Sequence, residues 1–319
     1  MPKQNLKNDK PLELKAINLG LIGLGYFGKN YLRLLQNTKG VHLRTVANRE
    51  SDAFETHKNL LKRIKTTLNA DDIFSDPEID AVFIVTPPGT HYSLIETGLK
   101  SGKHIFVEKP MVLNVSDAKK LKPLVQKSGK VFMVGFQYVF NENIRFIKKE
   151  IENGTFGKII SFSNEHAVSP SRPDIDVFTD AAPHPLSVFQ YLFNPKKLIS
   201  VDGEMAHDDA SVQIQFEKAP LLNIKTSSFG ETKTRKLTLV GEKATAILDE
   251  TLEENKLSIL KDGKITYPEI TSKEPLQSEV EQFIHCIKTG ETPLTNIDFG
   301  SQITKWLEVI SEKIKSPAN

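Results

Sequence analysis

The sequence contains very little cysteine, because Cys286 is the single thiol among 319 residues. One cysteine excludes an internal disulfide and a cysteine-rich zinc site, and it fits the reducing conditions of a cytoplasm. Phe283 and Ile287 are its apolar neighbours on a predicted helix, so we expect a buried structural thiol rather than a nucleophile. We predict no metal site.

The chain also lacks a strong net charge and a long apolar run. Its formal charge is +2 and no basic cluster lies among aromatic residues, so we expect no nucleic-acid partner. No apolar run approaches the length that spans a bilayer, and residues 1–11 are polar without the apolar core of a signal peptide. These absences predict a soluble, cytoplasmic protein without a membrane partner, and its length allows two domains.

The most informative feature that is present is a glycine-rich turn after a short apolar strand. Gly23, Gly25 and Gly28 follow the apolar stretch, and a predicted helix begins at Phe27. In a nucleotide-binding turn the first glycine allows the sharp bend, the second lets backbone approach a pyrophosphate, and the third lets helix and strand pack closely. The helix N-terminus adds free N–H groups. We therefore predict a dinucleotide site that includes Tyr26 and Phe27, rather than an ordinary turn.

The second predicted strand, residues 41–47, bears on the choice of cofactor. About twenty residues after the glycines, NAD-binding domains place an Asp or Glu that binds the ribose 2′-hydroxyl. This chain has Asn48 and Arg49 there, followed by Glu50. The missing carboxylate removes repulsion against a 2′-phosphate, and Arg49 can pair with that phosphate or stack on adenine. We assign both residues to a cofactor site for NAD(P) and favour NADP; the alternative is a solvated charged turn.

Strands and helices alternate through the first part of the chain. The apolar, β-branched run at 81–85 is typical of a strand buried on both faces of a parallel sheet. Further strands are predicted at 104–107 and 131–134, and helices at 90–101 and 116–128. The alternation predicts a doubly wound, parallel Rossmann domain over residues 15–136, after a polar extension at 1–14.

The loops that follow these strands are candidate ligand contacts, because open α/β sheets bind ligands at the C-terminal ends of their strands. Thr86, Pro87 and His91 lie in the loop after the strand at 81–85, and Gln137 follows the last predicted strand. We assign these four residues to the cofactor site.

The strand at 104–107 runs into Glu108, Lys109 and Pro110. A charged pair at the end of a buried strand faces the crevice in which a nicotinamide would lie. A lysine there can hydrogen-bond a substrate hydroxyl, and its pKa can fall through desolvation and a neighbouring positive nicotinamide. We assign Glu108 and Lys109 to the cofactor site and Lys109 also to catalysis; the alternative is a surface salt bridge in a loop.

The second half of the chain, residues 137–319, has a different pattern. After a predicted helix and strand come a polar loop at 169–178 and then short strands between 198 and 267 with hairpin signals such as Asp262-Gly263. Two amphipathic helices follow, at 276–288 and 298–314. Consecutive strands without intervening helices predict an antiparallel sheet, so this region is expected to form an α+β domain.

His184 is the third candidate for chemistry. A lone histidine would be a helix-capping or core residue, but Asp180 lies four residues earlier, where a carboxylate can orient the imidazole. A lysine, a histidine and an aspartate beside a nicotinamide supply the group that takes the hydroxyl proton as hydride leaves carbon. We interpret five other histidines as surface or core residues, with His166 the least certain of His42, His57, His166, His207 and His285.

These motifs occur in the order seen in the Gfo/Idh/MocA oxidoreductase family, which the chain resembles from about residue 15 to residue 314. The resemblance implies a Rossmann domain followed by an open, mostly antiparallel sheet that carries the substrate pocket and the oligomer contacts. It also implies that Lys109 and His184 form the catalytic pair, and that Asp180 binds the substrate hydroxyl or orients His184. Many members have an Asp three residues after the histidine, where this chain has Ser187. That version is similar to some members that act on nucleotide sugars.

The function that this resemblance and the residues imply is hydride transfer between a secondary alcohol or ketone and a nicotinamide. The expected substrate is sugar-like: a sugar, an inositol or a nucleotide sugar. A homo-oligomer, a dimer or tetramer formed through the C-terminal sheet, is expected. Two alternatives remain: a non-catalytic, dinucleotide-dependent sensor of the same fold, and a dihydrodiol or carbonyl reductase.

Overall fold

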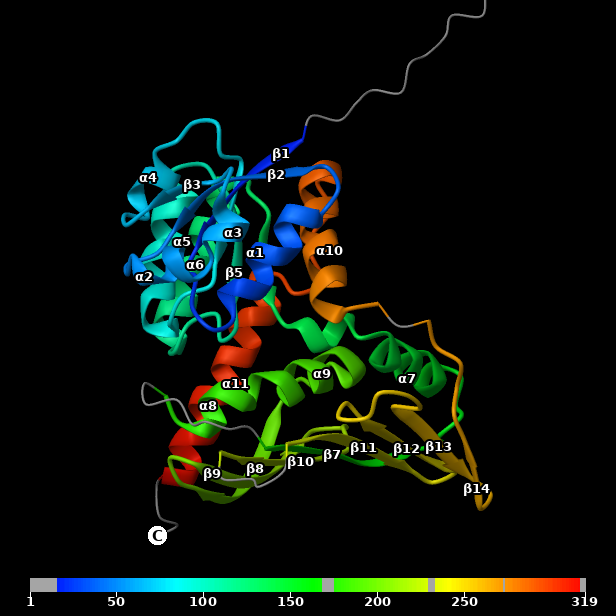
Figure 1. The fold of residues 1–319 in the computed structure, drawn as a ribbon. Coiled ribbons are helices and arrows are strands. Elements are labelled where there is room, and N and C mark those ends of the chain that lie inside the picture. Colours follow the sequence, from blue (N-terminus) through cyan, green and yellow to red (C-terminus); the bar gives the residue numbers. More distant parts are fainter. Residues whose placement is uncertain (1–15, 168–174, 229–232, 272, 316–319) are drawn as a thin grey trace, which may run out of the picture.

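The computed structural model describes residues 16–167, 175–228, 233–271 and 273–315. Two β-sheets face each other with helices between and around them, the first at the top of Figure 1 and the second edge-on at the bottom. The predicted extension at 1–14 and most of the polar loop at 169–178 lie outside the described residues.

The first sheet has six parallel strands in the order β3-β2-β1-β4-β5-β6. This order confirms the predicted Rossmann architecture. Its strands are β1 (Ile17–Ile22), β2 (Val41–Ala47), β3 (Lys65–Thr67), β4 (Ala81–Ile84), β5 (His104–Glu108) and β6 (Phe132–Gly135). Its helices are α1 (Gly28–Asn37), α2 (Asp52–Thr56), α3 (Lys58–Leu61), α4 (Asp71–Phe74), η1 (Pro88–Thr90), α5 (His91–Lys100) and α6 (Val115–Ser128).

The edge of this sheet beyond β2 was not anticipated from the sequence. Strand β3 has three residues and is largely exposed, and α2, α3 and α4 span only four or five residues each. Elements this short have too few turns or alternations to show a hydrophobic period. The central strands were predictable because β4 is buried at all four positions.

An aromatic cluster links the C-terminal part of the chain to the first sheet. Phe283 of α10 (Pro275–Thr289) packs with its ring centroid 5.3 Å from Phe83 and 5.6 Å from Phe106, and Tyr31 of α1 lies 5.7 Å from Phe83. Figure 1 shows α10 beside α1. The chain therefore returns to the first domain after building the second sheet.

The second sheet has eight strands in the order β14-β13-β12-β11-β7-β10-β9-β8. Every neighbouring pair is antiparallel except β7 and β10, as expected for an open, mostly antiparallel sheet. Its strands are β7 (Ile159–Ala167), β8 (Leu198–Met205), β9 (Asp209–Phe216), β10 (Leu221–Ser227), β11 (Thr234–Gly241), β12 (Ala244–Asp249), β13 (Leu257–Lys261) and β14 (Lys264–Thr266). Asp262 and Gly263 form the predicted hairpin turn between the last two strands, with φ of 50° and 72°.

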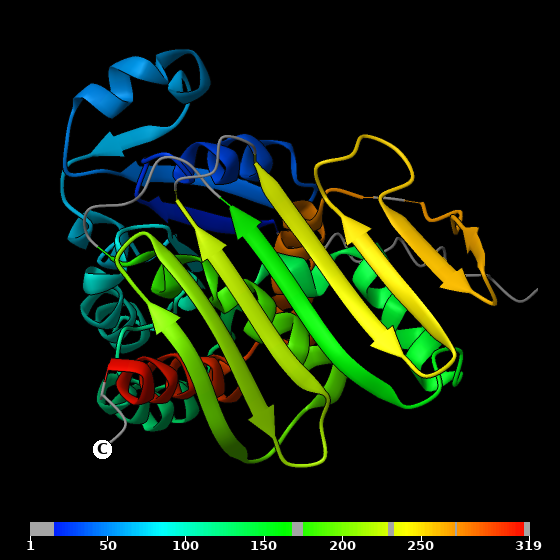
Figure 2. The ribbon, with the colours of Figure 1, turned by 90° about the horizontal axis from the view of Figure 1, so that it is seen from below.

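One face of this sheet is covered by helices and the other is bare, as the view from below shows (Figure 2). On the covered face, Phe189 of α9 lies 5.7 Å from Phe162 of β7 and 5.4 Å from Phe216 of β9. Trp306 of the last helix lies 4.8 Å from Phe216. The remaining elements are η2 (Gln137–Phe140), α7 (Glu142–Glu152), α8 (Val177–Ala181), α9 (Pro183–Phe193) and α11 (Ile297–Lys315).

Helix α11 ties the two layers together, because it packs on α6 and β6 of the first domain and on α9 and β8 of the second. The C-terminal ends of β4 and β5 are thereby held opposite α8 and α9. Within the described residues, no helix is long and apolar enough to cross a bilayer.

Candidate active site

The three glycines of the first turn have different reasons to be glycine. Gly23 has φ of 100°, and a Cβ there would lie 2.3 Å from the carbonyl oxygen of Val85. A Cβ on Gly28 would lie 2.2 Å from the carbonyl oxygen of Gly23. A Cβ on Gly25 would meet nothing within 4 Å. The fold itself therefore requires the first and third glycines, whereas Gly25 borders open space beside the start of α1, which fits a pyrophosphate approaching the backbone.

The residues at the end of β2 support this turn. The Asn48 Oδ1 atom accepts a hydrogen bond of 2.9 Å from the Leu24 amide, and its Nδ2 donates to the Glu50 carbonyl. Arg49 is exposed next to it. Asn48 therefore holds the glycine turn in place, and the guanidinium of Arg49 is the cationic group available where the ribose of a bound dinucleotide lies.

The two aromatic residues of the turn lie differently. The ring of Tyr26 is 87% exposed beside the Lys29 ammonium, whereas Phe27 packs on Tyr31 at 5.8 Å. Of the residues predicted in the later loops, Thr86, Pro87 and Gln137 keep some surface open to solvent. These positions suit contacts with a cofactor that lies across the strand ends.

His91 is placed below the cofactor crevice rather than on its surface. The residue is fully buried, its Nδ1 lies 2.9 Å from the carbonyl oxygen of Pro110, and its Nε2 lies 2.9 Å from that of Thr86. The imidazole therefore joins the loop after β4 to the loop after β5. Because both of its ring nitrogens already face backbone oxygens, His91 has a role in shaping the site.

Lys109 and Asp180 meet across the two domains. The Lys109 Nζ atom lies 2.9 Å from Asp180 Oδ1 and donates a second hydrogen bond of 2.8 Å to the Asp180 carbonyl. The two side chains are only 16% and 24% exposed. The carboxylate therefore positions the ammonium, whereas the sequence suggested that it would orient His184. The Nδ1 atom of His184 has no hydrogen-bond partner within the described residues.

A buried pair of carboxyl groups lies behind Lys109. The Tyr31 hydroxyl lies 2.6 Å from Glu108 Oε1 and 3.4 Å from Glu279 Oε2, and Glu108 Oε2 accepts a hydrogen bond from the Lys109 amide. Burial raises the pKa of Glu108 to about 7, and burial together with Glu108 raises that of Glu279 well above its usual value. The Tyr31 hydroxyl can donate its one proton to only one of the two carboxyl groups. The other carboxyl group is therefore held in the neutral form, in which it donates a proton of its own. Glu108 thus fixes the backbone of the lysine.

His184 lies in an aromatic and imidazole stack at the start of α9. Its ring centroid is 5.8 Å from that of His166, with the planes 6° apart, and 4.8 Å from that of Tyr138. Burial, then Lys109, His166 and Arg235, lower the pKa of His184 well below its usual value. Burial, then Arg235 and Lys109, lower the pKa of His166 to about 4. Both imidazoles are therefore neutral at pH 7.

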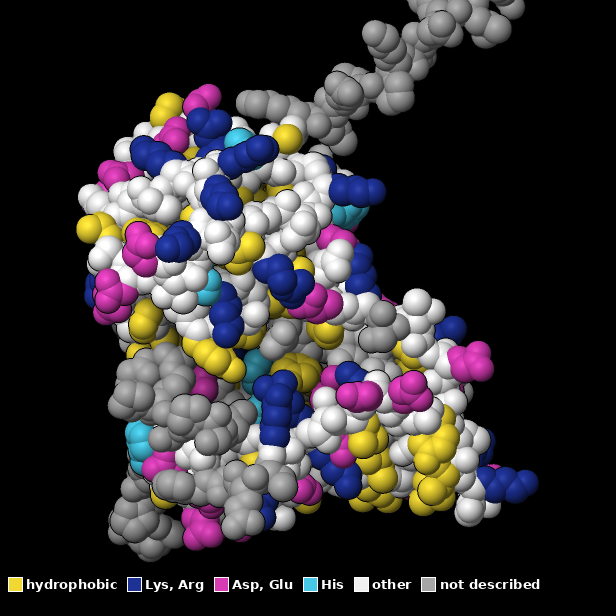
Figure 3. Space-filling model, viewed as in Figure 1, with side chains coloured by type: hydrophobic (Ala, Val, Ile, Leu, Met, Phe, Trp, Pro, Cys, Tyr) yellow, Lys and Arg dark blue, Asp and Glu magenta, His cyan; other side chains and the backbone are white. Residues whose placement is uncertain are grey.

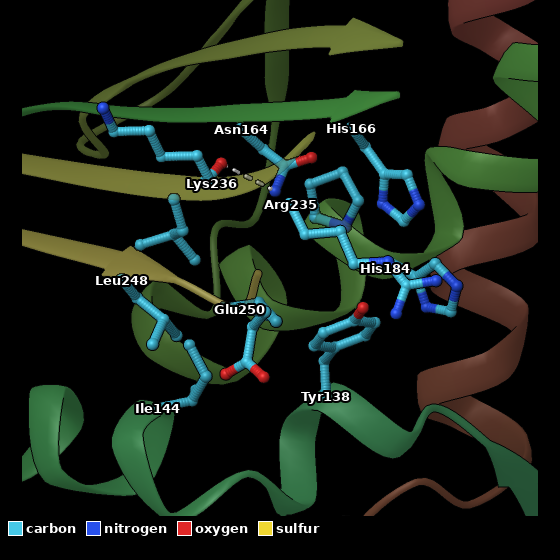
Figure 4. Close-up of a pocket in the computed structure, with 12 residues that line it drawn as sticks. Tyr138, Ile144, Asn164, His166, His184, Arg235, Lys236, Leu248 and Glu250 are labelled. Atoms are coloured by element: carbon cyan, nitrogen blue, oxygen red, sulfur yellow. Dashed lines mark hydrogen bonds between the residues drawn. The ribbon is translucent and has the colours of Figure 1, made fainter. Parts of the chain in front are cut away.

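Sequence reasoning missed the polar end of the second sheet. Along β7 the inward residues change from Phe162 through Asn164 to His166, and His166 lies opposite Arg235 of β11 and beside Thr226 of β10. Figure 4 shows Arg235, His184 and Tyr138 pointing toward one another from three different elements. The signal in the sequence was a polar residue at every second position near the end of a predicted strand, at Asn164 and His166. The residue that faces His166 depends on strand pairing, which the sequence pattern does not show.

Figure 3 shows histidine and Lys or Arg side chains close together between the upper and lower layers. Among the described residues there is no group of three or more His, Cys, Asp or Glu side chains that could hold a metal ion. The candidate site therefore has three parts: a lysine held by a carboxylate, a neutral imidazole in a small cavity with Tyr138 and Arg235, and an open glycine turn.

Known proteins resemble the chain along nearly its whole length. It is 26% identical to the scyllo-inositol 2-dehydrogenase (NAD(+)) of Bacillus subtilis, over 90% of each chain, and 25% identical to an inositol 2-dehydrogenase of Rhizobium meliloti, over 86% of this chain and 90% of that one. Its fold matches the UDP-N-acetylglucosamine 3-dehydrogenase of Acidithiobacillus ferrooxidans with a TM-score of 0.82 at 21% identity, covering 95% and 99% of the two chains. A 3-ketoreductase of Actinomadura kijaniata, in complex with NADP, matches with a TM-score of 0.84 at 14% identity, covering 93% and 98%.

Family models account for both parts of the chain. Residues 17–136 match the model described as an oxidoreductase family with an NAD-binding Rossmann fold, and residues 148–317 match the C-terminal alpha/beta domain of the same family. With the glycine turn, the Glu108-Lys109-Pro110 strand end and the Asp180 and His184 helix start also in place, the chain belongs to the Gfo/Idh/MocA family of oxidoreductases.

Proposed function

We propose that this protein is an NAD(P)-dependent dehydrogenase or reductase that acts on a secondary alcohol or ketone of a sugar-like substrate. The observation that carries the proposal is the contact of Lys109, from the end of β5, with Asp180 of α8, which lies four residues before His184 at the start of α9. The names of the inositol and nucleotide-sugar dehydrogenases that resemble the chain agree with such a substrate.

The residues of this site can handle the proton that alcohol oxidation releases. The ammonium of Lys109, held by Asp180, donates a hydrogen bond to the substrate oxygen and stabilises the negative charge that develops there. The imidazole of His184 is neutral, so one of its ring nitrogens carries a lone pair that can take the hydroxyl proton, and the lowered pKa of the ring favours passing that proton on. A bound nicotinamide supplies the hydride acceptor or donor.

The chain's own residues would hold the cofactor from both ends. The open backbone at Gly25 and the start of α1 face the pyrophosphate, and the loops containing Thr86 and Glu108 border the nicotinamide. We propose NADP as the preferred cofactor, because β2 ends in Asn48 and the exposed Arg49 instead of a carboxylate. We further propose that the bare face of the second sheet pairs subunits into a dimer or tetramer, which sedimentation velocity tests.

A reduction assay tests the proposed function. The protein is mixed with NAD or NADP and with sugars, inositols, sugar acids and nucleotide sugars, and absorbance of the reduced nicotinamide is followed. We expect turnover with at least one sugar-like alcohol, and its loss in Lys109→Met. The matched control is Lys103→Met, because Lys103 is another buried lysine of the same domain, bonded only to the carbonyl oxygens of Asp76 and Ile79 among the described residues. Cofactor binding without turnover of any substrate would instead support the sensor.

A further inference from the structure

An unpaired arginine lines the same small cavity as His184. Arg235 has no ion pair or hydrogen bond from its side chain within the described residues, and its Nε atom is shielded from solvent. Glu250, the acidic residue that lines the same cavity, is already occupied: its Oε1 accepts a hydrogen bond of 2.8 Å from Asn141, and its Oε2 lies 3.7 Å from Lys256. A partly buried guanidinium without an acceptor is costly, so a missing anionic partner is expected.

The surroundings of Arg235 carry an excess of positive charge. Lys109 is paired with Asp180. Arg235 and Lys233 also lower the pKa of His166, and neither forms an ion pair with a carboxylate among the described residues. Burial first, and then these cations, lower the pKa of both neighbouring imidazoles. A negatively charged group placed here gains attraction from Arg235 and meets no competing carboxylate in contact with that guanidinium.

The size and shape of the space select among anions. The cavity enclosed by Arg235, His184, Tyr138 and their neighbours has a volume of about 30 Å³, which is room for two water-sized groups. A planar carboxylate presents two oxygens at that scale and matches the fork of a guanidinium, whereas a tetrahedral phosphate is larger.

Arg235 also lies close to the proposed reaction centre. Arg235 and His184 line the same cavity, and Figure 4 shows their side chains pointing toward one another, so a group bound to the guanidinium lies beside the proposed catalytic histidine. On the basis of the proposed function, we propose that the substrate is a sugar acid, whose carboxylate binds Arg235 while its secondary hydroxyl lies at Lys109 and His184.

Binding measurements test this proposal without relying on turnover. Calorimetry on the NADPH-loaded protein compares glucuronate, galacturonate and mannuronate with glucose, galactose and mannose, and with the three corresponding 6-phosphates. We expect at least one uronate to bind about ten- to a hundredfold more tightly than its neutral sugar, the range of a hydrogen bond to a charged group. Arg235→Gln should remove this preference and leave the affinity for neutral sugars unchanged, and Arg235→Lys should retain part of it.

The matched control is Lys225→Gln, which removes a cation from an exposed position of β10, outside the residues that line the cavity. It should keep the uronate preference, and thermal melts should show that all three variants fold. The proposal is overturned if no uronate is preferred, if the 6-phosphates bind more tightly, or if the preference survives in Arg235→Gln. Uronate binding that depends on Arg235 without nicotinamide turnover would refute the proposed function alone, and oxidation of neutral sugars with no acid preference would refute this inference alone.

Discussion

The two sheets of this molecule contribute to the site in different ways. The first is parallel and buried on both faces, and its functional residues lie in loops at the ends of β1, β4 and β5. The second is mostly antiparallel and covered on one face, and its functional side chains, such as His166 and Arg235, project from within strands. We propose that the first sheet binds the cofactor with backbone and loop ends, whereas the second binds the substrate with alternate side chains of one face.

This difference separates two kinds of specificity. A loop at a strand end can present free N–H groups to a group shared by all dinucleotides, so the first sheet suits the constant cofactor. A row of side chains across paired strands can be changed one at a time, so the second sheet suits a variable substrate. Variants in the two sheets should accordingly separate cofactor binding from substrate recognition.

The largest effect is expected at the contact between the sheets. Lys109→Met and His184→Asn should each lower turnover by roughly a hundred- to ten-thousandfold, because the first removes the charge that stabilises the developing negative oxygen and the second removes the proton acceptor. Affinity for NADPH should stay near native, since the glycine turn holds the pyrophosphate independently. Stopped-flow turnover and calorimetry on the same preparations provide the check; near-native rates in both variants would contradict the assignment.

The next effect concerns the first sheet alone. Gly25→Val should weaken NADPH binding by at least about a hundredfold, because the added side chain fills the space beside the backbone that several charge-assisted hydrogen bonds require. Its melting temperature should remain close to native. Gly28→Val is the contrasting variant, since its Cβ would collide with Gly23 and should destabilise the fold. Native affinity in Gly25→Val would remove this turn from the cofactor site.

A smaller effect should distinguish the two cofactors. Arg49→Ala should weaken NADP binding by about 1.5–3 kcal/mol and change NAD binding little, because only NADP carries the 2′-phosphate that the guanidinium pairs with. Lys39→Ala is the control, an exposed cation before the opposite end of β2. Equal losses for both cofactors, or tighter binding of NAD by the native protein, would refute the preference for NADP.

The smallest effect is a pH dependence of stability that arises in the second sheet. The pKa of His166 is about 4 in the folded protein and about 6.5 in the unfolded chain, so the unfolded chain takes up the proton first as pH falls. This residue should therefore cost about 1 kcal/mol of unfolding free energy between pH 7 and pH 5.5, and the loss should continue toward pH 4. Urea unfolding of His166→Gln should show a weaker dependence, whereas His42→Gln, on an exposed position of β2, should match the native protein.

In the first sheet, Glu108 should act with the opposite sign. Its pKa is raised to about 7, so its contribution to stability is fully present below about pH 4.5 and is lost as pH rises through 7. If variants of His166 and Glu108 changed the pH dependence of stability in the same direction, the environments described for these two residues would be wrong.

Local motifs made the first sheet predictable. The glycine turn, the apolar strands and Glu108-Lys109-Pro110 each lie within one short stretch, and their meaning follows from the order of strand, loop and helix. The hairpin at Asp262-Gly263 was predictable for the same reason.

Long-range pairing made the rest unpredictable. The facing of His166 and Arg235 depends on the register of strands β7 and β11, which are separated along the chain by helices α8 and α9 and strands β8, β9 and β10. Glu279 reaches the Tyr31 hydroxyl only because α10 packs back on the first domain. The pairing of Asp180 with Lys109 instead of His184 likewise arises from how the two domains meet. A sequence pattern shows which side chains share a face but not what that face meets.

The central claim is that Lys109 and His184, from different domains, act on the same hydroxyl group of one substrate. The most direct test is a double-mutant cycle in turnover with Lys109→Met, His184→Asn and the combined variant. If the two groups act as a unit, the combined variant should be about as slow as the slower single variant, because either loss already disables the proton transfer. If the two losses multiply, the residues act independently, and the account of a single proton-handling site between the sheets is wrong.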